Sequence, residues 1–538
     1  MSLPKDGTQW PPKPVAQVTA RAREAQVWWE GDPTKLDRYY QTNQKTAPSL
    51  TQRAKDAYRA FWGRPVGNTA QPIRRVHVPI AGGIVSMSAT ELFSEQWTFR
   101  PAGSKVRTAD LPTPAQPQAE DSENQTAPAS PTLVVPSPLQ ARADLILNSP
   151  QHAASLFAAG VRTSALGGGY ARVVFDPEVA DNAWIDYVDA DHAFAEFRWG
   201  KVVAVTFWTE LENLDNQLVL RHLERHERGR IVHALYQGTG SNLGRRIDLG
   251  AHDATRRLKV EIGRDGESYV ATGADKELSA GYVPNVIPNP DWRNDPTLCN
   301  YGRSDLSVDV IPLLHEIDAV ASGLTRDFRV SQARVYASRS VLQSGGFGEG
   351  LHLDDAQEMF TTIGDGMKDG DMASLFEYYQ PDIRVEKHAL GIEVLTREVL
   401  RKTGYSPLTF GLPDEVAQTA TEATGKAKQT LTTTQGKARL WAAMLAPIGT
   451  TCLRIDAAQF PGKGVAPEEQ LDLELPEFAS LSDEAKARVV QAWDVSGSAS
   501  TRTKVAYLHS DWDEDRIDRE AQEIDGRTAA PSPLPDGF

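Results

Sequence analysis

The chain has 538 residues, more than one compact core usually holds, so the sequence predicts several structural units. Hydrophobic residues make up 40% of it and aromatic residues 8%, which excludes general disorder. Its net charge of −15 argues against a sequence-reading DNA-binding protein, because a chain with a net negative charge does not attract the phosphates of DNA. Its 2 cysteines exclude a disulfide scaffold and a four-thiolate zinc site.

The N-terminal third is predicted to be mostly helical. Apolar residues recur at steps of three and four over residues 15–61, and residues 76–97 start extended and then turn helical. Residues 101–138 contain eight prolines among Ala, Thr, Gln and Ser, a composition that predicts an exposed, disordered insertion. Two further helices are expected, at 139–147 and 153–166. The N-terminus lacks the apolar core of a secretory signal and no stretch of about 18 apolar residues follows, so we expect a soluble protein made inside the cell.

Residues 170–282 change from helical spacing to alternation of apolar and polar residues, which predicts an antiparallel meander of six or more strands. His222 and His226 lie four residues apart in this pattern and therefore on one face of a strand. The sequence shows no obvious carboxylate ligand for them, so a solvated strand face is favoured over a metal site.

The second half is predicted to be helical around a small α/β segment. A helix capped by Ser304 and kinked at Pro312 is expected to run to about residue 329. This helix is followed by a strand at 334–343, a short helix at 353–360 and a helix at 382–402 that ends at Gly404. After these we expect a loop at 405–418, a long helix at 419–446 and polar C-terminal helices at 481–524.

The sequence contains no convincing catalytic or cofactor motif. A phosphate-binding loop is absent, and the His315-Glu316 pair lacks the second histidine of a zinc protease. Two acidic groups could be considered as cation sites, but an exposed acidic turn and charges at a helix start explain them better; they are Asp365, Asp369 and Asp371, and Asp354, Asp355 and Glu358. The long helix carries basic residues that are as compatible with phosphate contacts as with a solvated or intersubunit face: Lys426, Lys428, Lys437 and Arg439.

Four segments, in this order along the chain, resemble the portal proteins (head-to-tail connectors) of long-tailed bacteriophages, especially those of actinobacterial phages. They are VWWEGDPTKLDRYY, RRVHVPIAGGIVSMSATELFSEQ, YGRSDLSVDVIPLLHEIDAVASGL and PLTFGLPDEVAQTATEATGKAKQT. The resemblance implies an α+β portal fold with a β-rich wing, a two-helix stem, a small α/β clip, a long wing helix and an α-helical crown. The implied boundaries are 1–300 wing, 301–329 first stem helix, 330–381 clip, 382–404 second stem helix, 405–418 tunnel loop, 419–474 long wing helix and return, and 475–538 crown and tail.

The same resemblance implies a ring of twelve identical subunits at one capsid vertex, through which DNA is packaged and ejected. The implied partners are double-stranded DNA that passes through non-specifically, the major capsid protein, a scaffold, the terminase large subunit and a head-completion adaptor. Assembly is implied to occur in the host cytoplasm, with no membrane and no cofactor. The DNA-channel candidates are Arg397, Arg401, Lys402, Tyr405, Thr409, Phe410 and Leu412, and the candidates on oligomer helices are Leu313, Ile317, Leu324, Ile392, Leu395 and Val399.

A ring needs two different contact faces on each subunit, and long helices with apolar stripes could supply them. An acidic balance also suits a conduit, because a strongly basic wall would hold the DNA backbone and stop it sliding. The rival interpretation is a phage-encoded, metal-dependent DNA-processing enzyme, which we expect to be a monomer or small oligomer that responds to magnesium. A third, a head-completion or scaffold-interacting adaptor, is disfavoured by the length of the chain.

Overall fold

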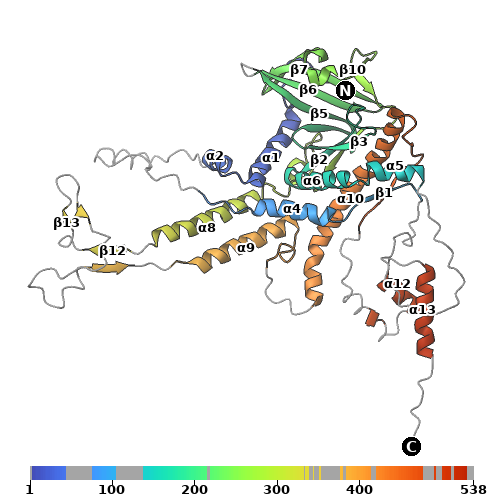
Figure 1. Ribbon diagram of the computed structural model, residues 1–538. Coiled ribbons are helices and arrows are strands. Elements are labelled where there is room, and N and C mark those ends of the chain that lie inside the picture. Colours follow the sequence, from blue (N-terminus) through green and yellow to red (C-terminus); the bar gives the residue numbers. More distant parts are fainter. Residues whose placement is uncertain are drawn as a thin grey trace, which may run out of the picture. The chain divides into compact units, whose positions relative to one another are not determined.

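The structure is a computed structural model that describes residues 3–43, 75–103, 137–214, 218–331, 334–337, 343–344, 351–352, 376–379, 383–412, 420–476, 490–491, 493, 500–509 and 514–529. It is mixed helix and sheet, as the α+β prediction requires (Figure 1). The chain divides into two compact units. The first comprises Met1–Trp29, Gly82–Ser307 and Thr403–Phe538, and the second comprises Glu30–Ala81 and Val308–Lys402.

The helices expected near the N-terminus are present. They are α1 (Lys13–Glu30), α2 (Pro33–Asn43) and α4 (Ile80–Phe93). Gly31 separates the first two with a φ of 63°, a left-handed conformation that glycine adopts without steric cost. The rest of the helical pattern predicted up to residue 61, and all but the ends of the 101–138 insertion, lie outside the described residues.

The predicted meander is divided into two sheets. In the larger, the order is β4-β5-β6-β7-β10-β9, with β8 also pairing β7, and every pairing is antiparallel. Its strands are β4 (Ala193–Arg198), β5 (Lys201–Leu214), β6 (Leu218–Glu227), β7 (Arg230–Thr239), β8 (Asn242–Ile247), β9 (Glu261–Ile262) and β10 (Ser268–Ala271). The smaller has the order β11-β2-β3 and comprises β2 (Gly168–Val174), β3 (Trp184–Asp189) and β11 (Ala280–Pro284). The short helix α7 (Asp253–Arg256) follows β8.

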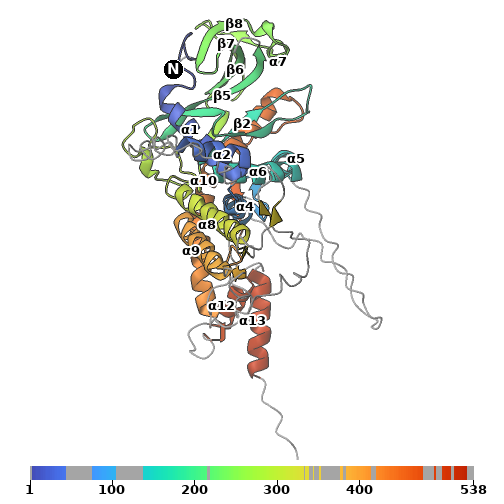
Figure 2. The same ribbon diagram turned by 90° about the vertical axis from the view of Figure 1, so that its left-hand side faces the viewer.

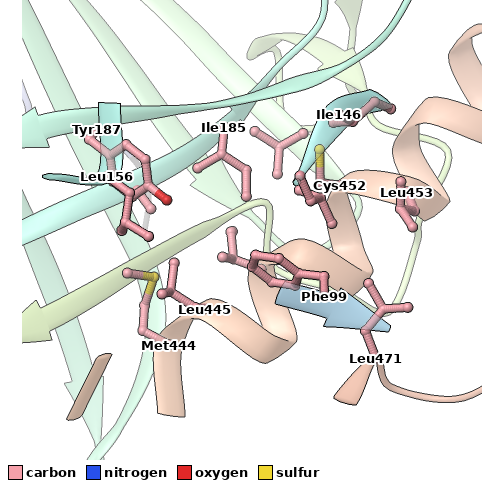
Figure 3. Packing of buried hydrophobic residues seen from close by; sticks show 14 of the residues in the cluster. Phe99, Ile146, Leu156, Ile185, Tyr187, Met444, Leu445, Cys452, Leu453 and Leu471 are labelled. Atoms are coloured by element: carbon pink, nitrogen blue, oxygen red, sulfur yellow. The ribbon is translucent and has the colours of Figure 1, made fainter. Parts of the chain in front are cut away.

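The largest apolar core of the first unit surrounds the long helix α10 (Ala420–Gln459), which packs against β2, β3 and β11 (Figure 3). The helices α5 (Pro138–Ile146) and α6 (Pro150–Leu166) and the paired strands β1 (Thr98–Arg100) and β16 (Asp472–Glu474) complete it. The sequence predicted that α10 would end near residue 446, but it continues through Pro447. Ile448, Cys452 and Ile455 are buried in the core, and their burial offsets the roughly 3 kcal/mol that an internal proline costs.

The second unit contains α8 (Ile311–Val330) and most of α9 (Val385–Thr403), with the strand pairs β12 (Arg334–Ala337) with β15 (Phe376–Tyr379) and β13 (Gln343–Ser344) with β14 (Leu351–His352). The predicted start of α8 at Ser304 and the kink at Pro312 are wrong. Ser304 Oγ instead accepts from the Leu306 amide, and Pro312 lies in the first turn of α8, where a missing amide costs nothing. Of the predicted strand 334–343, the structure describes β12 and the first residue of β13, both of them strand. Residues 338–342 and the helix predicted at 353–360 lie outside the described residues.

Near the C-terminus, α12 (Thr501–Leu508) and α13 (Glu514–Ala529) pack together through Val505, Ile517 and Ala521. The helix α12 and most of α13 fall within the predicted helical segment 481–524, and α13 continues to Ala529. None of the helices in the described ranges is long and apolar enough to cross a membrane.

Candidate functional site

The helices α8 and α9 form an antiparallel pair, and both views show them side by side (Figures 1 and 2). His388 Nε2 lies 3.0 Å from Asp327 Oδ2 at one end of the pair, and Lys402 Nζ lies 3.5 Å from Asp309 Oδ2 at the other. The hydrogen bond from His388 lowers the pKa of Asp327. Gly323 faces the His388 ring, where an added Cβ would come within 3.3 Å of Cε1, so glycine permits the close approach of the two helices.

The residues of these helices that were predicted to make oligomer contacts are buried or partly buried within the chain itself. Ile317 and Val399 are buried, and the other four are partly buried: Leu313, Leu324, Ile392 and Leu395. On α8 the fully buried leucine is Leu314 rather than Leu313. The predicted stripe of α9 therefore lies on its intramolecular face and leaves the opposite face for other contacts.

The opposite face of α9 is apolar along its first half and basic along its second. Leu390 and Val394 are 61% and 57% exposed. Arg397 and Arg401 follow at steps of three and four, so the helical repeat places all four on one face. Phe328 on α8 is also 51% exposed. Leu390 and Val394 were not predicted as functional residues, although their spacing of four along the helix was a usable signal.

The three cations predicted for the channel are each paired with a carboxylate of the same unit. Arg397 Nη2 lies 2.8 Å from Glu393 Oε1, and Arg401 Nη2 lies 2.7 Å from Glu398 Oε1. The Arg401 hydrogen bond lowers the pKa of Glu398. Lys402 pairs with Asp309, as described above. Exposed pairs of this kind contribute little stability, but they reduce the net positive charge that a passing phosphate would meet.

The described part of the predicted tunnel loop, residues 405–412, packs against other segments of the first unit. The Ser406 amide donates to Thr430 Oγ1 on α10 at 2.9 Å, and Thr409 Oγ1 lies 3.0 Å from the same hydroxyl. Phe410 packs on Gly83 of α4, where an added Cβ would come within 3.0 Å of the ring. Leu412 is partly buried, and its amide donates to the Pro407 carbonyl. Residues 413–418 lie outside the described residues.

Tyr405 and Lys437 belong to a buried polar cluster of the first unit rather than to an exposed surface. Lys437 Nζ donates to Asp305 Oδ2 at 2.6 Å, to Ser88 Oγ at 2.8 Å and to Tyr405 Oη at 2.9 Å. Burial alone lowers the pKa of Lys437, but the adjacent Asp305 carboxylate raises it overall, so the amine stays charged. Neither Tyr405 nor Lys437 is therefore exposed to a phosphate in this conformation. Lys428 and Arg439 are exposed.

The histidines of β6 are not a solvated face, contrary to the sequence prediction. His226 is fully buried and lies 2.6 Å from Glu224 Oε1, while His222 stacks on His233 at 3.2 Å between ring nitrogens. Burial would raise the pKa of Glu224, but the charge of Arg172 and the hydrogen bond with His226 hold it well below its usual range. The carboxylate is thus an ion-pair partner inside the sheet.

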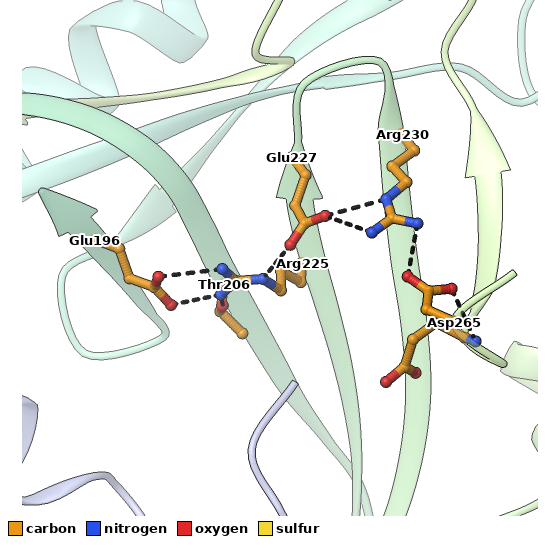
Figure 4. Close-up of polar contacts among 7 residues, drawn as sticks. Glu196, Thr206, Arg225, Glu227, Arg230 and Asp265 are labelled. Carbon is orange, nitrogen blue, oxygen red and sulfur yellow. Dashed lines mark hydrogen bonds and ion pairs between the residues drawn. The ribbon is translucent and has the colours of Figure 1, made fainter. Parts of the chain in front are cut away.

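A second chain of ion pairs ties neighbouring strands of the larger sheet together (Figure 4). Arg225 joins Glu196 of β4 to Glu227, and Arg230 joins Glu227 to Asp265. Every member has an opposite charge as its neighbour, so the buried guanidinium of Arg225 is compensated by Glu196 and Glu227.

Asp189, Asp191 and His192 bring three possible ligand atoms within 4.8 Å of one another. Asp189 already pairs with Arg162 at 2.5 Å and Asp191 with His192 at 3.1 Å, so the group is accounted for without a cation. The acidic residues considered at 354–371 lie outside the described residues.

No protein-family model and no curated protein matches the chain. Among solved structures, the neck of an empty GTA particle computed with C6 symmetry is similar at 12% identity, covering 80% of this chain and 90% of that chain with a TM-score of 0.35. The neck of a native GTA particle computed with C12 symmetry is similar at 12% identity, covering 66% and 79% with a TM-score of 0.32.

Proposed function

We propose that this protein is a portal subunit. Twelve copies form a ring at a unique capsid vertex, and the ring conducts DNA during packaging and ejection and docks the terminase and the head-completion and tail proteins. It performs no reaction of its own. The proposal is supported by the resemblance of the four sequence segments to portal proteins. In the structure it is supported by the face of α9 that carries Leu390, Val394, Arg397 and Arg401.

The exposed apolar residues of α9 carry the proposal. Leu390 and Val394 stand on the opposite side of the helix from Val399, which is already buried within the chain. Two large aliphatic side chains in adjacent turns, each more than half exposed, are stabilised when a partner covers them, by roughly 1.5 to 3 kcal/mol for each fully buried side chain. In a ring, a neighbouring copy supplies that cover at every subunit.

The charges fit a conduit for DNA. Arg397, Arg401 and Lys402 offer guanidinium and ammonium groups to phosphates, but each is shared with a carboxylate. Contacts with the DNA backbone are then weak and brief, which permits sliding. The chain as a whole carries −15, which adds repulsion.

Assembly of the purified protein tests the proposal. Light scattering and negative-stain images should show annular particles near 710 kDa, the mass of twelve chains of 59.0 kDa. Leu390→Asp should reduce these particles to small species without unfolding the chain, because the side chain is exposed. The matched control is Ala389→Asp, which adds the same charge at an exposed position about 100° around the helix. A wild-type chain that stays monomeric at high concentration and turns over DNA with magnesium would instead identify the rival enzyme.

A further inference from the structure

The outer strand of the smaller sheet bonds to its neighbour through only half of its backbone groups. Among the described strands, β11 pairs with β2 alone. The Val173 amide of β2 donates to the Ser279 carbonyl, just before β11 begins. In an antiparallel ladder every second residue bonds to the same neighbour, so Gly281 and Val283 follow Ser279 in bonding to β2.

The intervening residues, Ala280, Tyr282 and Pro284, direct their backbone groups away from β2. Within the part of the chain that the structure describes, no hydrogen bond joins these groups to another segment. Pro284 agrees with this register, since a proline inside a sheet is confined to an open edge. Ala280 and Tyr282 are only 4% and 9% exposed, and Gly281 lies against Met444 of α10. The strand is therefore covered on its faces and open along its edge.

A groove of about 600 Å³ lies along this open edge, between β11 and α10. A volume of this size is typical of ligand sites. Ala280, Tyr282 and Pro284 all line the groove, as their register predicts. The wall that α10 contributes is apolar and consists of Leu440, Ala443, Met444, Pro447 and Ile448. A chain that lay beside β11 would place every second side chain against this wall.

The charged side chains of the groove are Lys201, Glu277 and Arg454. Glu277 forms an ion pair with Arg454 and accepts from Thr451 Oγ1 at 2.8 Å. Arg454 also donates to two backbone carbonyls, at 3.0 and 2.9 Å. Lys201 is exposed, and none of the described carboxylates forms an ion pair with it. The groove therefore has an unmatched positive charge, which is complementary to an acidic ligand.

We propose that the α10–β11 groove binds an extended, acidic peptide segment of a partner protein, which adds to the sheet as a strand beside β11. Ala280 and Tyr282 bond to the peptide backbone, apolar side chains of the peptide lie against α10, and a carboxylate pairs with Lys201. A helical segment does not fit this edge, because its own amides and carbonyls are already bonded to each other. The site lies within the first unit and does not depend on the proposed ring.

Binding of a synthetic peptide to the purified full-length chain tests the site. The probe is fluorescein-labelled Val-Glu-Val-Glu-Val-Glu-Val, measured by fluorescence anisotropy. Two further forms carry N-methyl groups on alternate amides, one on the valines and the other on the glutamates. Only one of these two sets of amides faces β11 in an added strand, so one form should bind like the parent and the other about tenfold or more weaker. Equal binding of both forms, or no binding of the parent up to about 1 mM, would overturn the proposal.

Three variants of the chain locate the bound peptide, and their melting temperatures establish that each is folded. Ala443→Trp fills the groove from an exposed position of α10 and should abolish binding. Lys201→Glu should weaken binding of the acidic probe and strengthen binding of a probe with lysine in place of glutamate. Arg198→Glu is the matched control, because Arg198 pairs with Lys201 in the β4–β5 hairpin but does not line the groove.

The control variant should bind both probes nearly as the wild type does. An acidic probe that binds the folded Ala443→Trp and Lys201→Glu chains as tightly as the wild type would place the peptide elsewhere and overturn the site. These outcomes are separate from those for the portal proposal, because a wild-type chain that binds the probe but never forms annular particles overturns the ring alone.

Discussion

Lys437 and Asp305 form an ion pair in the interior of the first unit, with 2.6 Å between Nζ and Oδ2 and only 3% and 4% of the residues exposed. Asp305 also accepts from Asn285 Nδ2 at 2.8 Å and from Ser164 Oγ at 2.6 Å. Every polar atom of the pair therefore has partners, which is the condition under which a buried ion pair is tolerated. The pair joins α10 to the segment before α8, and through Tyr405 to the segment after α9.

Lys437→Met should destabilise the protein by roughly 3 to 5 kcal/mol, because the Asp305 carboxylate is left buried without its counter-charge. Urea unfolding of the purified chain measures this change. Lys428→Met removes an exposed charge from the same helix and should change the free energy of unfolding by less than about 0.5 kcal/mol. Adding Asp305→Asn to Lys437→Met should recover part of the loss. If both single variants are equally stable, the pair does not hold the fold.

Because some of its histidines are buried, the folded protein should lose stability in mild acid. Burial lowers the pKa of His152 from 6.5 to about 4, and that of His233 likewise to about 4. Between pH 6.5 and 4 the unfolded chain takes up a proton at each site that the native chain refuses, so the free energy of unfolding falls as pH falls. One site contributes up to about 3 kcal/mol across that window.

His152→Gln should flatten this decline, since glutamine does not titrate and can still bond to Tyr187 Oη, which lies 2.9 Å from His152 Nε2. Denaturant unfolding between pH 4 and 7 checks it. His192→Gln serves as the contrast, because the Asp191 hydrogen bond raises the pKa of His192 and its contribution runs the other way. An unchanged slope in His152→Gln would mean that this histidine does not stay neutral in the folded chain.

Sequence periodicity predicted where the helices lie better than it predicted which of their residues pack against other elements. The repeat of Ile392, Leu395 and Val399 placed these residues on one face of α9, because a repeat within one helix needs no distant partner. In the structure Val399 is buried and Ile392 and Leu395 are partly buried within the chain. Leu313 and Leu314 are both compatible with the α8 repeat, and only packing against other elements decides that Leu314 is buried.

Long-range pairs left no local signal. From the sequence, Lys437 looks like one of several cations on a solvated helix. Its partner Asp305 lies 132 residues earlier, too far along the chain for a sequence pattern to link the two. Glu224 is an exception: it lies between His222 and His226 on the same strand face, and the prediction that these histidines have no carboxylate beside them was wrong. The burial of that face depends on the neighbouring strands and could not be predicted from the alternation alone. The channel and ring assignments remain predictions from the resemblance.

The proline-rich insertion is expected to be dispensable for assembly. Ser137 Oγ accepts from the Gln140 amide and caps α5, and Gly103 donates to Asp472, so a deletion should keep both ends. Replacing residues 104–136 by a flexible Gly-Ser linker should leave annular particles unchanged in number and mass, because that composition buries little apolar surface. Particles that fail to form in the linker variant, but form when the wild-type segment is restored, would show that the insertion is structural.

Neutralising the three cations of α9 should lower the amount of DNA packaged per capsid. In the triple variant Arg397→Gln, Arg401→Gln and Lys402→Gln, the carboxylates of Glu393, Glu398 and Asp309 lose their counter-charges and repel phosphates. Ring assembly should persist, because exposed ion pairs contribute little to stability. Packaging assays with purified heads measure the change. A charge-neutral control, Glu393→Gln with Arg397→Gln, should package nearly as the wild type does, and unchanged packaging in the triple variant would refute a role in DNA contact.

Aspartate substitutions at Ile317 and at Leu390 should distinguish an effect on folding from an effect on ring assembly. Ile317 is 1% exposed, and an aspartate there would be a buried carboxylate without a partner, which costs several kcal/mol. Ile317→Asp should therefore give an unfolded or aggregated chain, and Leu313→Asp, at a partly buried position, a milder loss. Leu390→Asp should keep the wild-type circular dichroism spectrum and melting temperature while failing to form annuli. If Ile317→Asp still assembled normally, the assigned packing of α8 would be wrong, because no folded chain could keep that charge where the isoleucine now lies.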